Sequence, residues 1–581
     1  MSGLIASLLV LLCAWRPSPA PAAEELVVRF DGLELPIDLD ALEAWSRDPA
    51  RPRGDQATWL NLLDDRSRTG LIRLLQAPLL QDRSFATELL GSWSGEQVLR
   101  QVGGLLTGPQ GESTGPLLLV SLQRLFERQA SVTALDLLRE LPVQQVTLEV
   151  DGLLALAQHW RGQLQHQKRA MAELRRLPLP VRQSQPLLVG RPRSSQPAMP
   201  RRLELPVAHR SAPLPIDLWA SRGSPRAEPE PWLLLMPGLG GSSSQLNWLA
   251  SALAEQGWPV LVLEHPGSDE RAVQASLSGQ GPPPGAESVP QRLADVQAVL
   301  NARAEGRLPA LGPPGAGDAG VVLMGHSLGG LVALMAAGLV PEQGLAARCR
   351  QALASLPLTN VSRLLQCQLG AITGDGSPRQ ARAVLQQPLL MVGTPLLAVV
   401  SFNGFGSLLW SERGLADLPV PVLMAGGSLD LITPPVQEQL SLLSSSRHPR
   451  SRLVMVEGGS HFSPVRVEGD SEALFRLGQE FVGEDPRLVQ ELLLRLTSEF
   501  LDSARHDGLL SPQRRRHGGV EASVLDADAA RVWQSRLAPP PAPLGVGRGP
   551  ALRGEPALRG EPGLRSGSWD PAGPRADPPP P

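Results

Sequence analysis

Residues 201–508 predict an α/β fold built on a mostly parallel sheet. Short apolar runs of strand length alternate there with segments whose apolar residues recur at helical spacing. Several of these runs end in glycine-rich turns, and polar side chains follow the turns directly. Because the sites of open α/β sheets lie beyond the carboxyl ends of the strands, we expect a functional site at that edge.

The predicted strands are apolar runs that glycine, proline or a polar turn closes. The first two are expected to form an opening pair, and several later ones lead into a helix. The predicted strands are residues 203–210, 214–220, 232–236, 260–263, 321–324, 420–424 and 453–456. The predicted helices are residues 245–256, 290–304 and 331–339.

The 581-residue chain is long enough for about two to four domains. Its tail repeats ALRGEP in tandem and cannot bury enough apolar surface to offset its ordering entropy, so we expect it to be disordered. Composition predicts a targeting segment (1–22), a mainly helical domain that opens with a short β pattern (23–180), a Pro/Ser/Arg-rich linker (181–200), the α/β domain (201–508), a C-terminal extension (509–538) and the Pro/Gly-rich tail (539–581).

The charge balance excludes several classes of function. A net charge of −3 argues against a nucleic-acid binder, which needs a basic face to neutralise phosphates. There is no tyrosine, and Lys168 is the only lysine, which disfavours Schiff-base, phosphate-loop and Tyr–Lys chemistry. No spacing of His, Cys and carboxylate residues is typical of a metal site, so we expect neither a metal nor a cofactor.

The first residues are typical of an export signal. Residues 4–15 form an apolar run of twelve, too short to span ~30 Å of hydrocarbon. Ala20-Pro21-Ala22 then matches a signal-peptidase site, although no basic residue precedes the run. We expect export to a periplasmic, lumenal or secreted location; the alternatives are an uncleaved anchor or a wrongly assigned start. Cys349 and Cys367 would remain, and the sequence leaves open whether they pair.

Residues 325–329, GHSLG, fit the G-x-S-x-G nucleophile elbow. An apolar strand precedes this pentapeptide and an apolar helix follows it. The sharp reversal leaves no room for Cβ atoms next to the serine, which explains the two glycines. The turn would lift the Ser327 hydroxyl clear of the sheet and beside a helix N-terminus, whose dipole favours a developing negative charge.

A serine hydroxyl needs a base, and the base needs an acid that orients it. Asp430 and His461 follow Ser327 in the chain order Ser–acid–His, each after a predicted strand. His461 would accept the serine proton, and Asp430 would hold the imidazole tautomer. The backbone N–H groups of Leu328 and Leu239 would form the oxyanion hole.

Other residues compete for these roles. Asp417 is a second acid, but it precedes its strand and is expected at the opposite edge of the sheet. His265 ends a neighbouring strand and could line the pocket, whereas His326 is expected to have a structural role within the elbow.

At these residues the chain resembles the α/β-hydrolase superfamily, and more closely the platelet-activating-factor acetylhydrolase and dienelactone-hydrolase-like enzymes. The matching pieces are PGLGG (237–241), Glu264-His265, RLAD (292–295) and GHSLGG (325–330). The arrangement is similar to cyanobacterial hydrolases with an uncharacterised N-terminal region, and it covers about residues 22–508.

Two departures from that group stand out. Pro237 occupies a position where the group often has histidine. The acetylhydrolases also place their acid after the strand that follows the elbow, yet residues 351–360 contain no acid. Asp430 must therefore supply the acid of the triad.

An insertion at about residues 355–415 is where hydrolases of this fold often carry a lid. Residues 383–411 contain no charged side chain. This run is interpreted either as a buried pair of cap helices or as an apolar lid that lines an acyl pocket or touches a lipid surface. Both versions favour a hydrophobic ester over a charged peptide.

We therefore expect a serine hydrolase that cleaves lipid or short-acyl esters through an acyl-enzyme intermediate. A thioesterase, an acyltransferase or a serine peptidase would share the same triad, because the pocket decides the substrate. The alternative from another class is a catalytically silent binding protein whose N-terminal domain is the functional part.

Overall fold

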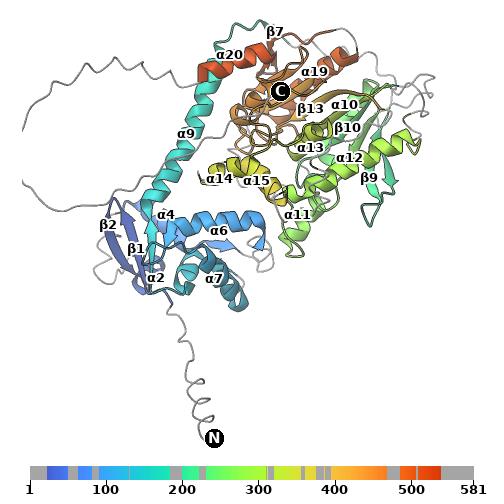
Figure 1. Ribbon diagram of the computed structural model, residues 1–581. Coiled ribbons are helices and arrows are strands. Elements are labelled where there is room, and N and C mark those ends of the chain that lie inside the picture. Colours follow the sequence, from blue (N-terminus) through green and yellow to red (C-terminus); the bar gives the residue numbers. More distant parts are fainter. Residues whose placement is uncertain are drawn as a thin grey trace, which may run out of the picture. The chain divides into compact units, whose positions relative to one another are not determined.

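A computed structural model gives the fold of the chain (Figure 1). The structure describes residues 22–49, 60, 63–80, 91–129, 131–183, 199–220, 230–308, 311, 319–354, 360–373, 385, 394–466, 485–505 and 508–537. The expected signal segment, the C-terminal tail and most of the linker lie outside these residues. No helix in the described part of the chain is both long enough and apolar enough to cross a membrane.

The N-terminal region folds around a small four-stranded sheet. Its first two strands, β1 (Glu25–Phe30) and β2 (Leu33–Asp38), are the expected β pattern, and they form an antiparallel hairpin. Asp31 and Gly32 both have positive φ at the turn, as a tight hairpin requires. The sheet has the order β2-β1-β6-β4, with β4 at Leu106–Thr107 and β6 at Gln145–Glu149.

Helices pack on this sheet through apolar faces and begin at capping residues. Asp38, Asp64 and Ser92 cap three of them, and Thr133 forms a capping box with Asp136. The helices are α2 (Leu39–Arg47), α4 (Asp65–Gln76), α6 (Trp93–Leu105), α7 (Gly115–Arg128) and α8 (Ala134–Glu140); a two-stranded ladder joins β3 (Pro78–Leu80) to β5 (Val132–Thr133).

The second sheet has eleven strands and a parallel centre, as the sequence predicts. Six neighbouring strands run parallel and are almost entirely buried, so each consists of a continuous apolar run. In spatial order these are β15 (Arg452–Val456), β14 (Val422–Gly427), β13 (Leu396–Phe402), β12 (Val321–His326), β10 (Trp232–Met236) and β11 (Val260–Leu263). Antiparallel strands β9 (Leu214–Trp219) and β8 (Arg201–Leu205) complete one side, while β17 (Val520–Leu525), β16 (Gln513–His517) and β7 (Val181–Gln183) complete the other.

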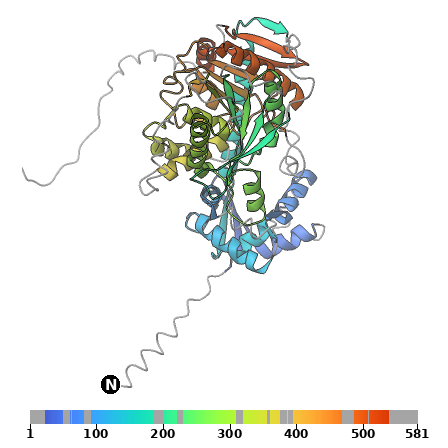
Figure 2. The same ribbon diagram turned by 90° about the vertical axis from the view of Figure 1, so that its right-hand side faces the viewer.

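Helices cover both faces of this sheet, which gives two apolar cores (Figures 1 and 2). The first core contains α12 (Val289–Ala304), α13 (Leu328–Ala336) and α20 (Ala527–Leu537). The second contains α10 (Asn247–Glu255) and α19 (Pro486–Arg505). The shorter helices are η1 (Ser243–Leu246), α11 (Glu270–Leu277), η2 (Ala286–Ser288), α14 (Leu345–Ala354), α15 (Val361–Thr373), η5 (Val436–Leu440) and α17 (Ser441–Leu443).

The sheet continues beyond the boundary expected at residue 508. Strand β17 pairs with β15, and β16 pairs with β17, so these strands are part of the α/β domain rather than a separate extension. Composition concealed β16 because it reads QRRRH, a charged strand near the sheet edge with no apolar run.

Helix α9 (Val150–Arg175) also crosses an expected boundary. Its final turns belong to the core of the α/β domain, where Ala170, Met171 and Leu174 are buried. Trp533 donates from its indole nitrogen to the Ala170 carbonyl at 2.8 Å. The helical region expected as a separate domain over residues 23–180 therefore contributes its last helix to the α/β domain.

The expected lid is wrong for residues 396–402. These residues form β13, a central strand between β12 and β14, and cannot contact a lipid surface. A charge-free apolar run is as typical of a buried parallel strand as of a lid, and this explains the error. Residues 408–410 are half-buried or buried beside the sheet, and residues 389–392 lie outside the described residues.

Candidate active site

Strand β12 delivers Ser327 to a sharp turn at the carboxyl edge of the sheet. Ser327 has φ 52° and ψ −119°, in the left-handed half of the backbone map, and α13 begins at the next residue. A Cβ on Gly325 would lie 2.2 Å from the Gly329 carbonyl carbon, and one on Gly329 would lie 2.3 Å from the Met236 oxygen. The two glycines of the pentapeptide are therefore steric requirements of a strained elbow.

His461 follows strand β15 and reaches the serine from the neighbouring loop. Its Nε2 lies 3.1 Å from Ser327 Oγ, within hydrogen-bond reach. His461 and Ser327 are 5% and 8% exposed, so the pair is shielded from bulk water.

Two glycine-rich turns bring Asp430 to the same place. Ser428 and Leu429 donate backbone bonds to the carbonyls of Val456 and Gly459, which joins the turn after β14 to the turn after β15. A Cβ on Gly427 would lie 2.2 Å from the Gly459 oxygen, so this approach requires glycine.

Asp430 is fully buried, and both of its carboxylate oxygens have hydrogen-bond partners. His461 Nδ1 lies 2.9 Å from Asp430 Oδ2, and the same oxygen accepts from Asn403 Nδ2 at 2.6 Å and from the Thr433 hydroxyl at 2.5 Å. The backbone N–H groups of Ile432 and Thr433 donate to Oδ1. Burial alone would raise the pKa of Asp430, but the charge of His461 and these hydrogen bonds lower it, so the carboxylate stays ionised.

His326 contacts the backbone of His461 but is not part of the hydrogen-bonded chain of Ser327, His461 and Asp430. Its Nε2 donates to the His461 carbonyl at 2.9 Å, and the two ring centroids lie 5.0 Å apart. Burial and the nearby charge of His461 lower the pKa of His326 to about 3, so the ring is neutral. This geometry agrees with a structural role within the elbow.

The loop that carries Leu239 lies against the elbow. A Cβ on Gly238 would meet Ser327 Cβ at 3.2 Å and His326 Nδ1 at 3.1 Å, so a larger residue would push the loop away from the serine. Leu328 is the first residue of α13, where backbone N–H groups have no intrahelical acceptor. Leu328 therefore directly follows Ser327 at a helix start, and the residue before Leu239 lies against the serine.

Asn403 and Thr433 are site residues that sequence reasoning missed. The strand that follows the elbow is β13, and Asn403 comes directly after it, at φ 49°. Residues 351–360 were therefore the wrong place to look for an acid after that strand. A correct assignment of β13 would have drawn attention to Asn403, because polar residues at strand ends mark the site edge.

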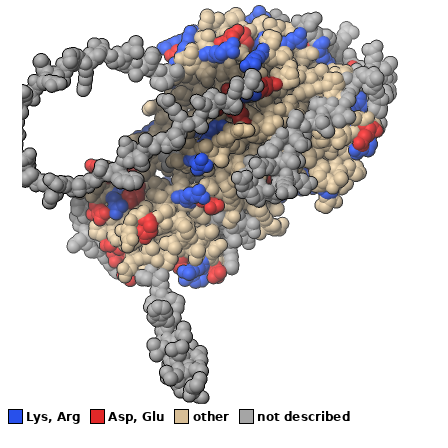
Figure 3. All heavy atoms as spheres, in the orientation of Figure 1, with Lys and Arg blue, Asp and Glu red and all other residues tan. Residues whose placement is uncertain are grey.

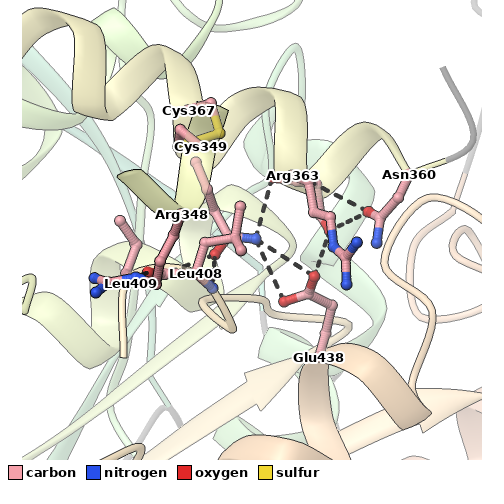
Figure 4. The surroundings of a disulfide bond; sticks show 10 residues. Arg348, Cys349, Asn360, Arg363, Cys367, Leu408, Leu409 and Glu438 are labelled. Atoms are coloured by element: carbon pink, nitrogen blue, oxygen red, sulfur yellow. Dashed lines mark hydrogen bonds between the residues drawn. A yellow bond between two sulfur atoms is a disulfide. The ribbon is translucent and has the colours of Figure 1, made fainter. Parts of the chain in front are cut away.

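The loop after β13 is held by Glu438 and by two helices that a disulfide joins (Figure 4). The Glu438 carboxylate, fully buried, accepts from the backbone N–H groups of Gly406 and Ser407 and from the Ser362 hydroxyl at 2.8 Å. Cys349 and Cys367 form a disulfide that joins α14 to α15, the helix that carries Ser362. These contacts fix the segment that follows β13. It begins with Asn403, which donates to Asp430.

The competing residues lie elsewhere. Asp417 pairs with Arg413 on the surface. His265 is fully buried and contacts Asp295 instead of lining a pocket. Within the described residues no group of three His, Cys, Asp or Glu could hold a metal ion.

The arrangement forms one hydrogen-bonded chain from a hydroxyl through an imidazole to a buried carboxylate. Such a chain can move a proton from Ser327 to His461 while Asp430 stabilises the resulting imidazolium. The N-terminus of α13 and the loop at Gly238 both lie against Ser327.

Two parts of the chain match family models. Residues 233–477, which include the elbow, Asp430 and His461, match the alpha/beta hydrolase family. Residues 22–149 match a family described as an alpha/beta hydrolase of unknown function (DUF1400), although these residues form the small four-stranded sheet and its helices. No curated protein matches the chain. On its sheet topology and on these matches, the protein contains an α/β-hydrolase domain.

Proposed function

We propose that this protein is a serine hydrolase that cleaves carboxylic esters through an acyl-enzyme intermediate. The observation that carries the proposal is the continuous hydrogen-bonded chain of Ser327, His461 and Asp430 at a strained elbow. Strain at a buried serine has no use in packing, but it presents a nucleophile and is typical of functional sites.

In the proposed reaction Ser327 Oγ attacks the ester carbonyl carbon while His461 Nε2 takes its proton. The carbonyl oxygen becomes an oxyanion, which accepts bonds from the backbone N–H groups of Leu239 and Leu328. Collapse of this intermediate expels the alcohol, whose oxygen takes the proton from His461. Water then attacks the acyl-enzyme with His461 again as base, and the carboxylic acid leaves as Ser327 regains its proton.

Apolar side chains around the site support an ester with an apolar acyl group. Leu429, beside Asp430, is 44% exposed, and the Phe462 ring packs edge-on against the His461 ring. Leu239 is half-buried on the other side of the serine. The resemblance to platelet-activating-factor acetylhydrolases extends this proposal to short-acyl, lipid and phospholipid-like esters. A thioesterase, an acyltransferase and a serine peptidase use the same chemistry and remain the alternatives.

The test is covalent labelling with a fluorophosphonate probe followed by a substrate series. We expect the wild type to be labelled, Ser327→Ala to lose labelling, and the matched control Ser278→Ala, a change at an exposed serine, to keep it. A series of p-nitrophenyl esters of increasing chain length, with a phospholipid and a thioester alongside, then assigns the substrate class. An unlabelled, folded wild type would instead support the non-catalytic binding protein.

We also propose that the protein is exported. The disulfide between Cys349 and Cys367 supports this, because disulfides persist in oxidising compartments and are rare in the cytosol. Cell fractionation and N-terminal sequencing of the mature protein test the proposal, and we expect a start shortly after residue 22. A full-length protein with free thiols in the cytosolic fraction would contradict it.

A further inference from the structure

Arg292 is a fully buried cation directly behind the loop that carries Leu239. It lies in the first turn of α12 and has no exposed surface. Its guanidinium donates to four oxygens, none of them a carboxylate: Nη1 to Pro237 O at 2.9 Å, Nη2 to Gly238 O at 3.0 Å and to Ser268 O at 2.9 Å, and Nε to Ser268 Oγ at 2.8 Å.

The bond to Gly238 O determines where the next N–H points. In a planar trans peptide the carbonyl of one residue and the N–H of the following residue point in opposite directions. When Arg292 holds the Gly238 carbonyl, the Leu239 N–H must therefore point away from the guanidinium. Gly238 itself lies against Ser327, and within the described part of the chain no acceptor bonds the Leu239 N–H.

We propose that Arg292 is a positioning residue that aims the oxyanion donor of Leu239; this inference rests on the proposed function. The guanidinium fork locks two successive carbonyls of the loop, and Ser268, which it also holds, accepts the Gly240 N–H at 2.9 Å. The donor is thus fixed before substrate arrives, and electrostatic catalysis by an oxyanion hole requires such fixed donors.

The charges of Asp295 and Asp269 favour the protonated form of Arg292, but its hydrogen bonds go to the oxygens of Pro237, Gly238 and Ser268. Asp295, one turn along α12, accepts two bonds from Arg210, and His265 and His209 each bond it through a ring nitrogen. Burial lowers the pKa of Arg292 to about 9, so the group stays protonated at neutral pH. A cation that polarises the Gly238–Leu239 peptide makes its N–H a stronger donor.

The test separates transition-state stabilisation from folding and from substrate binding. The variants are Arg292→Gln, Arg292→Lys and the matched control Arg303→Lys, which changes an equally buried arginine at the far end of α12. The measurements are kcat and KM for the best p-nitrophenyl ester, and the affinity for a trifluoromethyl ketone of the same chain length. That ketone forms a tetrahedral oxyanion on Ser327. Thermal unfolding shows which variants are folded.

We expect Arg292→Gln to lower kcat and the affinity for the ketone together by about 100-fold, the size of losing one oxyanion donor, with KM changed by less than about threefold. Arg292→Lys should lie between this variant and the wild type, and Arg303→Lys should match the wild type. If Arg292→Gln does not fold, Ser268→Ala removes a single acceptor of the fork and should show the same pattern at about tenfold or less. Folded variants with wild-type kcat and ketone affinity would overturn the inference.

Fluorophosphonate labelling distinguishes this failure from failure of the proposed function. A wild type that labels at Ser327, together with Arg292 variants that label at the same rate, contradicts the role of Arg292 alone. A wild type that neither labels nor hydrolyses any ester contradicts both proposals.

Discussion

The α/β-hydrolase domain contains two buried histidine–aspartate pairs that are nearly alike in local geometry. His461 Nδ1 lies 2.9 Å from Asp430 Oδ2, and His265 Nδ1 lies 2.8 Å from Asp295 Oδ2. Both aspartates are fully buried, and both histidines follow parallel strands of the same sheet.

The two pairs differ in what else binds the carboxylate. Asp430 accepts its other bonds from neutral donors, such as Asn403, so its charge is left for the imidazole. Asp295 accepts bonds from the Arg210 guanidinium through both oxygens, at 2.6 Å each, and His209 Nε2 lies 2.7 Å from its Oδ1. Burial would raise the pKa of Asp295, but the bonds from His265 and Arg210 lower it to about 2.

The surroundings of Nε2, the imidazole nitrogen that does not contact the aspartate, differ as well. His461 Nε2 faces Ser327 Oγ, whereas His265 Nε2 is buried and has no hydrogen-bond partner within the described residues. Burial and the charge of Arg292 lower the pKa of His265 to about 4. A histidine–carboxylate contact therefore becomes useful for catalysis only when the carboxylate is not already neutralised and the other nitrogen meets a nucleophile.

The two histidines provide the largest expected contrast. His461→Gln should lower kcat for ester hydrolysis by about 10⁶-fold, because the serine loses its base. His265→Gln should stay within about tenfold of the wild type, since this residue touches no reacting atom. Steady-state kinetics with the best p-nitrophenyl ester measures both, and comparable losses in the two variants would contradict the distinction.

The two aspartates should separate activity from stability. Asp430→Asn should cut turnover by about 10⁴-fold through the wrong imidazole tautomer, with unfolding unchanged within about 1 kcal/mol. Asp295→Asn removes the carboxylate that pairs with the half-buried Arg210 and should lower the free energy of unfolding by about 3–5 kcal/mol. Urea unfolding beside kinetics tests the pair. An Asp430→Asn enzyme of normal activity would assign the acid to another residue.

The sequence predicts this contrast only in part. It identifies Ser327, Asp430 and His461 by their order and by their places after strands, and the structure brings these three together. His265 meets the same positional criterion, since it too follows an apolar strand. What separates the two histidines is Arg210, which comes from a distant segment of the chain and belongs to no motif.

The strands were predictable where an apolar run ends in a glycine-rich turn, as at β10, β12, β14 and β15. Strand β13 was missed because its apolar run lies within the charge-free segment 383–411 that was interpreted as a lid, and Asn403 was missed with it. The contacts of Arg292 depend on tertiary approach between α12 and a distant loop, which periodicity does not encode. On the face drawn in Figure 3, basic and acidic side chains of the described residues are interspersed.

The pKa of His265 predicts a dependence of stability on pH. Unfolded, the imidazole binds a proton below about pH 6.5, but folded it does so only below about pH 4. Between these values the unfolded state holds more protons, so stability falls as the pH is lowered, by up to about 3 kcal/mol for this group. His265→Gln should remove this contribution and flatten the dependence of the unfolding free energy on pH between 6.5 and 4.5. The pKa of His326 is also lowered, so its own contribution to that dependence remains in the variant. An unchanged slope would contradict the assignment.

The smallest expected effect tests whether the neutral donors around Asp430 matter. Asn403→Gly removes the amide that bonds Asp430 and keeps the backbone conformation, because glycine adopts the positive φ of this position without strain. His461 and Thr433 still hold the same carboxylate oxygen, so kcat should fall by only about tenfold, the cost of one hydrogen bond to a charged group. Asn403→Asp is the sharper companion variant, since a second carboxylate would raise the pKa of Asp430 and shift the acid limb of the pH–rate profile upward. If neither variant changes kcat or that profile, neutrality around the carboxylate does not explain why this pair differs from His265 and Asp295.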